Sequence, residues 1–233
     1  MDGVDVSIIQ SDGESKYKVI KDKYFEYPQA IYKNLTKLRD KIKRVKDLKK
    51  YLKEIKNIEK EITLFHAKAV NQFLKKTKTN IDFIGFHGQT IYHNAKERIS
   101  KQVGDGKLLS KITKKTVVYD FRQNDLKNGG EGAPLTPIFH QMLQKRFNIK
   151  PVSFFNIGGI LNRTTIGKDG LLSARDLGPG MCLIDKWIRT KTNKKYDKNG
   201  KIAKVGKVNK NILDKYWNIF QISDPEKISY DIS

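Results

Sequence analysis

Short apolar segments of this chain are repeatedly followed by a polar loop and then by a segment with helical spacing. Four of these loops carry glycine together with polar residues: 87–90, 120–134, 156–162 and 176–180. In α/β proteins, ligands bind at the carboxyl ends of the strands, where such loops lie. The repetition therefore predicts an α/β fold in which the four loops line a single polar cleft.

Hydrophobic spacing gives a coarse order of elements. The start predicts a meander of three strands, at residues 4–9, 17–20 and 23–27. Pro28 suits the first turn of a helix, and a second, longer helix is expected from about 47 to 76. Further strands are expected at 81–86, 116–119, 152–155, 161–166 and 171–174, and further helices at 108–113, 137–147, 182–190 and 209–220.

The chain is strongly basic, with a formal net charge of +22 over 233 residues. Basic chains often bind nucleic acid. Only eight of the 47 basic residues are arginine, however, and the 39 lysines are spread along the whole chain. Because nucleic-acid-binding proteins rely on arginine for bidentate contacts, we expect solvated surface lysines and no nucleic-acid partner. A basic nucleic-acid-binding protein is a weaker alternative that rests on charge alone.

No apolar run approaches the ~20 residues that a membrane-spanning helix needs, so no membrane partner is expected. The first residues are acidic and contain no apolar stretch typical of a secretory signal. The single cysteine, Cys182, excludes an internal disulfide and suits a reducing compartment. These features predict a cytoplasmic protein.

Two of the polar loops carry residue types that bind anions or transfer protons. The segment 156–159, with paired glycines, is typical of a turn whose backbone N–H groups approach a phosphate, although the tetrapeptide taken alone favours a tight strand exit. Asp176 stands between a strand and a Gly-Pro-Gly turn, where a carboxylate serves either as a general base or as a capping residue.

The other polar residues are less specific. Asp120 and Asp125 bracket Arg122, so an ion-pair network explains them as readily as catalysis does. His87 and His93 lack the spacing of a metal site, and His87 is expected to be a hydrogen-bonded loop histidine. No metal ligand is assigned from the sequence.

Seven short segments follow one another in a characteristic order along the chain. They are 1–5 (MDGVD), 85–93 (GFHGQTIYH), 120–122 (DFR), 129–135 (GGEGAPL), 156–162 (NIGGILN), 176–180 (DLGPG) and 196–200 (YDKNG). In this order and spacing they resemble the 1,6-anhydro-N-acetylmuramic acid kinase family, within the actin-like/hexokinase-like ATPase superfamily. The resemblance implies an α/β, actin-like ATPase (ribonuclease H-like) architecture. Its first domain would be residues 1–121, and residues 122–233 would be an incomplete second domain.

The resemblance also implies an activity. Such a kinase uses ATP and Mg²⁺ to open 1,6-anhydro-N-acetylmuramic acid with water and to phosphorylate it, which gives N-acetylmuramic acid 6-phosphate in peptidoglycan recycling. The muramyl sugar would be the partner, and a homodimer is a further expectation.

By the same resemblance, individual residues acquire roles. Asp176 would be the general base that activates water. The nucleotide phosphates would be held by Asp2, Gly3, Val4, Asp5, Gly158 and Gly159. The sugar pocket would be formed by His87, Gln89, Asp120, Arg122, Gly132, Ala133 and Pro134.

The chain departs from the family pattern at several points. Family members carry Gly-Thr-Ser before the segment that matches residues 1–5, and a glycine-rich adenosine-binding segment beyond the point that matches Ser233. Met181 replaces the usual asparagine, and Glu131 replaces the usual glutamine. We therefore expect a chain truncated at both ends, and the alternative function is a non-catalytic fragment of the kinase that does not bind ATP productively.

Overall fold

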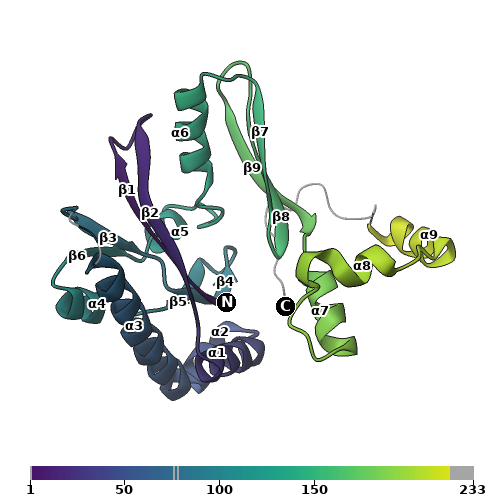
Figure 1. Cartoon of the computed structure of the whole chain (residues 1–233), viewed down its shortest axis with the longest axis horizontal. Coiled ribbons are helices and arrows are strands. Elements are labelled where there is room, and N and C mark those ends of the chain that lie inside the picture. The colour runs from purple at the N-terminus through teal and green to yellow at the C-terminus, as the bar shows by residue number, and fades with distance from the viewer. Residues whose placement is uncertain (1, 76, 78, 221–233) are drawn as a thin grey trace. The chain divides into compact units, whose positions relative to one another are not determined.

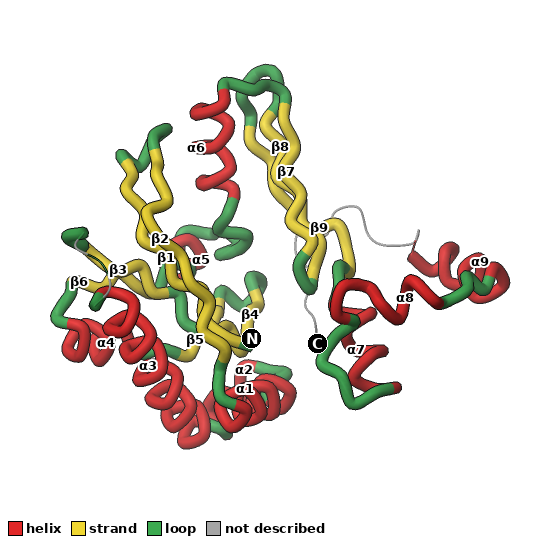
Figure 2. Tube along the Cα trace, in the orientation of Figure 1, coloured by secondary structure: helices red, strands yellow, loops and turns green. Residues whose placement is uncertain are grey.

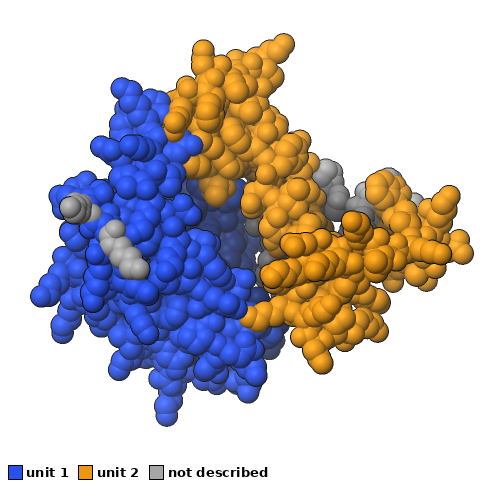
Figure 3. Space-filling view, in the orientation of Figure 1, with its two compact units in different colours: residues 1–135, 233 blue, residues 136–232 orange. Residues whose placement is uncertain are grey.

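The computed structural model describes residues 2–75, 77 and 79–220, which form helices and several small sheets (Figures 1 and 2). The chain divides into two compact units, of which one extends to Leu135 and the other begins at Thr136 (Figure 3). The predicted α/β class is confirmed. The assignment of residues 1–121 and 122–233 to two actin-like domains stays a prediction.

The first unit opens with a long β-hairpin and not with the predicted three-strand meander. Strand β1 (Gly3–Ser11) pairs antiparallel with β2 (Tyr17–Glu26), and a register shift follows Ile8. The turn between them is closed by the Asp12 carboxylate, which accepts the N–H groups of three following residues. Residues 21 and 22, which were predicted to separate two strands, are paired with Ile8 and Ser7 of β1. The irregularity is instead a β-bulge at residue 20, which has no partner in the register.

Three helices follow the hairpin. Helix α1 (Gln29–Lys41) begins directly after Pro28, and the predicted helix at 47–76 is divided at Tyr51 into α2 (Val45–Lys50) and α3 (Leu52–Leu74). The apolar stripe of α3 packs against α1 and β1. Buried residues of this core include Leu35, Leu38, Ile58, Ile62, Ile91 and Val103.

A parallel strand pair positions two of the polar loops. Strand β3 (Phe83–Phe86) pairs in parallel with β6 (Thr116–Tyr119), and Phe86 lies opposite Tyr119. The loops that begin at His87 and Asp120 therefore leave the same edge of this sheet. Between the two strands the chain forms a hairpin that the sequence did not predict, β4 (Gln89–Asn94) with β5 (Ile99–Val103), and then helix α4 (Gly106–Thr113).

The second unit is built on an antiparallel sheet of three strands in the order β7–β8–β9. Its strands are β7 (Val152–Ile157), β8 (Ile160–Ile166) and β9 (Leu172–Pro179). Its helical segments are α6 (Pro137–Phe147), α7 (Cys182–Lys191), the 3₁₀ turn η1 (Lys198–Gly200), α8 (Lys201–Val205) and α9 (Lys210–Phe220). Helix α6 packs on β8 and β9.

Two of the predicted loops are mostly strand in this unit. Strands β7 and β8 leave only Gly158 and Gly159 outside the sheet, and β9 continues to Pro179. The predictions of loops over 156–162 and 176–180 were therefore wrong in extent. The backbone of these polar segments still finds hydrogen-bond partners in the sheet, which explains why polar residues continue a strand here.

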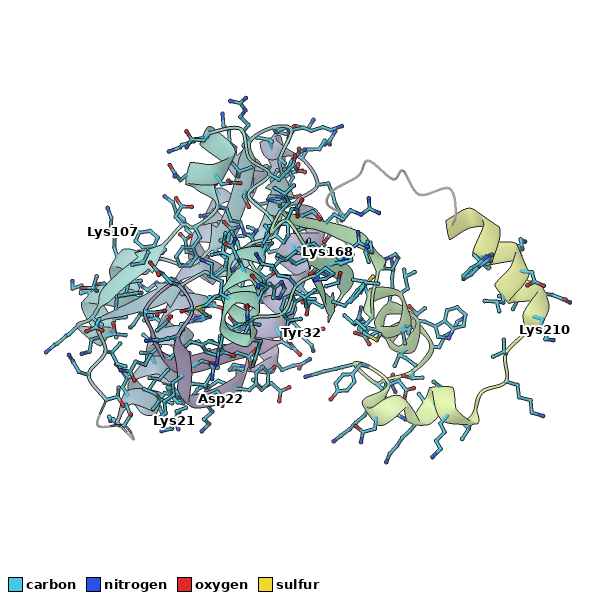
Figure 4. All side chains as sticks on the ribbon, turned by 90° about the horizontal axis from the view of Figure 1, so that it is seen from above. Lys21, Asp22, Tyr32, Lys107, Lys168 and Lys210 are labelled. Carbon is cyan, nitrogen blue, oxygen red and sulfur yellow. The ribbon has the colours of Figure 1, made fainter. Side chains whose placement is uncertain are left out.

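The surface agrees with the interpretation of the lysines as solvated side chains. Lys107 and Lys210 are exposed and project from the ribbon (Figure 4). Within the described residues, no helix combines the length and the hydropathy that crossing a bilayer would require. The absence of a nucleic-acid partner stays a prediction.

Candidate active site

In the first unit, three predicted sugar-binding residues form one hydrogen-bonded cluster. The Nε of Arg122 donates to the Nε2 of His87 at 3.0 Å, and its Nη1 donates to the carbonyl of Gly132 at 2.5 Å. His87 follows β3 directly, and Arg122 lies three residues beyond the end of β6. The parallel pairing of these strands thus brings together two loops that are 35 residues apart in the sequence.

The ring of His87 has a defined tautomer. Its Nδ1 lies 2.9 Å from the carbonyl of Gly88, which only accepts hydrogen bonds, so Nδ1 carries the proton and Nε2 is the acceptor for Arg122. Burial lowers the pKa of His87, and the nearby guanidinium lowers it further, while the bond to Gly88 opposes both effects. His87 is therefore a neutral, fully hydrogen-bonded loop histidine, as the sequence predicted.

Arg122 is a half-buried cation, and burial lowers its pKa. Among the residues that the structure describes, it makes no ion pair with Asp120 or Asp125, so the predicted ion-pair network is not found. Its two recorded partners, an imidazole and a carbonyl, are neutral. A partly desolvated guanidinium without a carboxylate partner favours an anionic ligand group, because a nearby negative charge would offset the cost of its burial.

The loop that contains Gly132 is held on both sides. The carboxylate of Asp125, in helix α5 (Gln123–Lys127), accepts the N–H of Gly132 at 2.7 Å, while Arg122 binds the carbonyl of the same residue. Gly132 has φ +65°, and a Cβ there would lie 2.8 Å from Cγ of the buried Leu126. Glycine is therefore required at this position on both steric and conformational grounds.

The other predicted sugar-binding residues near this cluster are Ala133, Pro134 and Asp120. Ala133 and Pro134 follow Gly132 directly, are half-buried, and are joined by a cis peptide bond. Asp120 is exposed and adopts φ +63°, a left-handed conformation that aspartate tolerates better than most residues.

A pocket of about 290 Å³ lies beside the cluster, and His87 and Asp120 both line it. Its other polar walls come from the β4–β5 hairpin, with Lys101, and from three uncharged polar residues of that hairpin and α5, namely Ser100, Gln102 and Gln123. These side chains hydrogen-bond to one another, since Gln102 donates to the Ser100 hydroxyl at 2.7 Å and Gln123 donates to the Ser100 carbonyl at 2.5 Å. None of the three was predicted from the sequence, because the hairpin that carries Ser100 and Gln102 was not predicted and Gln123 stands in no recognised motif.

The side chain of Gln89 is hydrogen-bonded to a buried pair, Tyr27 and His66, that was also not predicted from the sequence. Its Nε2 donates to the hydroxyl of Tyr27 at 3.3 Å, and this hydroxyl lies 2.9 Å from the Nε2 of His66. His66 stands four residues after the fully buried Ile62 on α3, so it falls on the apolar stripe of that helix. A histidine on a buried stripe needs a polar partner, and this signal was available in the sequence.

The predicted nucleotide-binding segment at the start of the chain lies largely on the first strand, which begins one residue before the predicted strand at 4–9. Gly3, Val4 and Asp5 belong to β1, and only Asp2 precedes it. Val4 is buried in the core, while the side chains of Asp2 and Asp5 are exposed. Gly3 lies against the opposite strand, where a Cβ would come within 2.5 Å of the Phe25 carbonyl.

In the second unit, Asp176 lies on β9 opposite Asn162 of β8 and is half-buried. The next pair joins Gly178 to Leu161, so Leu177 is an extra residue that forms a β-bulge directly after Asp176. Bulges of this kind are frequent next to active sites, where they redirect side chains.

The turn at Gly158 and Gly159 clasps the beginning of α7. The Gly159 carbonyl accepts the N–H of Gly180 at 2.9 Å, and the Gly158 carbonyl accepts the N–H of Met181 at 2.8 Å. A Cβ on Gly180 would collide with the Gly158 carbonyl, which explains the glycine. The predicted phosphate turn is thus adjacent to the Gly-Pro-Gly segment, and its carbonyls are occupied by this clasp.

Comparison with known proteins identifies the family. The model of the anhydro-N-acetylmuramic acid kinase family matches residues 1–226. The chain belongs to this family.

Curated members of the anhydro-N-acetylmuramic acid kinase family match almost all of the chain. The protein of that name from Pelagibacter ubique is 53% identical over 236 residues, which cover 100% of this chain and 63% of the relative. Those from Agrobacterium fabrum and Rhizobium etli are 40% and 39% identical, and each alignment covers 93% of this chain and 60% of the relative. The chain therefore spans about 60% of the length of these relatives.

One segment that carries the family resemblance has a structural role here. The carboxylate of Asp197 accepts the N–H groups of Ile202 and Ala203, both at 2.9 Å, and so caps α8. These hydrogen bonds lower the pKa of Asp197. Within the same segment, Asn199 and Gly200 adopt left-handed conformations.

Kinases of this family imply a nucleotide with Mg²⁺, and the arrangement of the carboxylates limits how this chain could hold that ion. Among the described residues, no group of three or more His, Cys, Asp or Glu side chains is placed to hold a metal. Mg²⁺ that arrives with a nucleotide usually takes one or two carboxylates, substrate phosphates and waters. The exposed carboxylates of Asp2 and Asp5 fit such a limited contribution and do not fit a resident metal centre.

Proposed function

We propose that this protein is an ATP-dependent kinase that opens 1,6-anhydro-N-acetylmuramic acid with water and phosphorylates it, giving N-acetylmuramic acid 6-phosphate and ADP in peptidoglycan recycling. Membership of the family supports this activity. The observation that carries it is the Arg122 cluster, in which a partly buried guanidinium without a carboxylate partner stands at a polar, glycine-bordered loop.

The sugar explains the chemistry of this cluster. Anhydro-N-acetylmuramic acid bears a lactyl carboxylate as well as hydroxyl and acetamido groups. We assign the carboxylate to Arg122, and the neutral polar groups to the pocket beside His87 and to Gln89. The pairing of a guanidinium with a carboxylate provides both charge and direction, because its hydrogen bonds are strong and planar.

Asp176 is the proposed general base. It takes one proton from water, whose oxygen bonds to C1 of the sugar while the bond between C1 and O6 breaks. The departing O6 takes the γ-phosphoryl group, and ADP leaves. Attachment to a strand favours this role, since pairing with β8 holds the backbone of Asp176 and so limits where its carboxylate can lie.

The nucleotide phosphates are assigned to the segment from Asp2 to Asp5 and to the turn at Gly158 and Gly159. Mg²⁺, when bound with ATP, supplies neutralisation of phosphate charge. We also propose that the two units correspond to the two domains of an actin-like ATPase, the second of them incomplete in these 233 residues.

The direct test is incubation of the protein with the anhydro sugar, ATP and Mg²⁺ in H₂¹⁸O, followed by mass spectrometry. The proposal expects a phosphorylated sugar that carries ¹⁸O at C1. Binding of the sugar without any product would identify the non-catalytic alternative, and absence of both binding and product would overturn the proposed substrate.

The variant Asp176→Asn tests the base. It keeps the size of the side chain but removes its basicity, so turnover should fall by a factor of about 10² or more while sugar binding stays within about two-fold. Asp169→Asn is the matched control, because Asp169 is an exposed carboxylate in the β8–β9 turn of the same sheet. Equal turnover of the two variants would remove the base role from Asp176.

A further inference from the structure

We propose that His66 and Tyr27 are positioning residues that fix the side-chain amide of Gln89, so that its carbonyl oxygen is the atom presented to the ligand. This inference rests on the proposed function, because it concerns how Gln89, one of the residues proposed to bind the sugar, recognises that ligand. Neither His66 nor Tyr27 was among the residues that the sequence or the family pattern assigned to the site.

The three residues come from separate elements of the first unit. Tyr27 follows β2, His66 lies on α3, and Gln89 begins β4. Tyr27 and His66 are almost fully buried, with 3% and 8% of their surfaces exposed, whereas Gln89 is half-buried. The chain of hydrogen bonds therefore runs from the core outward, and Gln89 is its outermost member.

Aromatic packing holds the inner two members in place. The ring of Tyr27 meets that of Phe65 edge-on at 5.0 Å, and the ring of His66 meets that of Phe86 at the same distance. Phe86 is the last residue of β3, directly before His87. The pair is thus anchored on the strand from which the Arg122 cluster begins, and rotation of either ring would disturb this packing.

The direction of these two hydrogen bonds follows from which atoms carry a proton. The side-chain amide nitrogen of Gln89 can only donate a hydrogen bond, so the Tyr27 oxygen is the acceptor. The Tyr27 hydroxyl then donates its own proton to His66. His66 must then be neutral, with its proton on Nδ1 and Nε2 as acceptor. Burial supports this state, since it lowers the pKa of His66 to about 4 and raises that of Tyr27 to about 12.

The opposite tautomer of His66 would reverse the chain. With the proton on Nε2, the histidine would donate to Tyr27, the Tyr27 hydroxyl would donate to Gln89, and the amide would turn to offer its oxygen inward. The buried tautomer therefore selects which end of the amide faces outward. In the observed arrangement Nε2 is bonded to Tyr27, which leaves Oε1, an acceptor, as the other end of the amide, so its counterpart on the sugar is a donor, a hydroxyl or the acetamido N–H.

The first experiment needs no ligand. Nitrogen-15 NMR of the histidine side chains reports which ring nitrogen of His66 carries the proton, and the side-chain amide signals of Gln89 report its hydrogen bond. We expect Nδ1 to be protonated, and we expect the variant Tyr27→Phe to shift the Gln89 amide signals to values typical of solvent-exposed glutamine. Protonation on Nε2, or unchanged amide signals in that variant, would overturn the inference.

Tyr92→Phe is the matched control for this measurement. It removes a phenolic hydroxyl that donates to Glu97 from the same strand, β4, three residues beyond Gln89. This control should leave the Gln89 amide signals where they are. An equal shift in both variants would mean that β4 as a whole had moved, and the positioning role would be lost.

The second experiment measures sugar binding by calorimetry in a double-mutant cycle. Tyr27→Phe should weaken binding roughly ten-fold, comparable to one hydrogen bond, but should have no further effect when Gln89 is already alanine. A purely structural role for Tyr27 would weaken binding by the same factor in both backgrounds and would contradict the proposal. If the unaltered protein does not bind the sugar, the proposed function fails, while the NMR experiment still decides the role of the pair.

Discussion

Acid should destabilise the first unit through His66. Burial lowers the pKa of this imidazole from 6.5 to about 4 in the folded protein, whereas in the unfolded chain it returns to its ordinary value. Between these two pH values His66 is protonated in the unfolded chain but remains neutral in the folded protein. Stability is therefore lost as the pH falls from about 6.5 to about 4, and no further contribution from His66 is expected outside that window.

The magnitude follows from the size of the shift. One pKa unit corresponds to about 1.4 kcal/mol, so a shift of roughly 2.5 units corresponds to about 3 kcal/mol. This is a large fraction of the 5–15 kcal/mol by which proteins are typically stable. The loss should be visible as a decrease in the free energy of unfolding measured with urea and far-UV circular dichroism at pH 7, 6, 5 and 4.

The variant His66→Gln isolates the effect. Glutamine retains a nitrogen and an oxygen that can bond to Tyr27, but it does not titrate. The unaltered protein should lose about 3 kcal/mol more than this variant between pH 6.5 and 4, because the other histidines are present in both proteins and cancel in the difference. Parallel loss of stability in the two proteins would refute the reasoning about burial.

Two further predictions concern single contacts. Arg122→Met should raise the pKa of His87, because the guanidinium is one of the causes that lower it; titration of the histidine ring protons by NMR checks this, and an unchanged pKa would contradict it. Gly180→Ala should destabilise the second unit by about 1–3 kcal/mol, since its Cβ would push against the Gly158 carbonyl. Thermal unfolding measures the loss, and equal melting temperatures of this variant and the unaltered protein would argue against the clasp.

The part of the site that the sequence predicted depends on short apolar strands. The strands at 81–86 and 116–119 were recognisable because each is an apolar run bounded by polar residues. The loops that follow these runs, at 87–90 and 120–134, were expected to share a polar cleft with two later loops; the bond of 3.0 Å between Arg122 and His87 joins the first two, and the cleft of all four stays a prediction. The roles of these residues in binding and catalysis stay predictions.

The β4–β5 hairpin was missed because its sequence, QTIYHN followed by ISKQV, lacks a clear alternation of apolar and polar residues. Ile91 and Val103 of these strands are buried in the hydrophobic core and Tyr92 packs against it, while several other residues of the hairpin make polar contacts that hydrophobic spacing does not reveal. Ser100 and Gln102 belong to this hairpin and were missed with it. The break at Tyr51 was missed for a related reason, since neither glycine nor proline marks it.

The single residue by which β9 exceeds its partner has a consequence for engineering. Because side chains alternate along a strand, Leu177 shifts the alternation between Asp176 and the glycines that follow it. The number of residues in this stretch is thus constrained as strongly as their identity. Substitution at Leu177 keeps the number of residues. Deletion or insertion of one residue there would move the Asp176 carboxylate to the opposite face of the strand relative to the clasp at Gly180. Variant libraries for this region should therefore hold length constant.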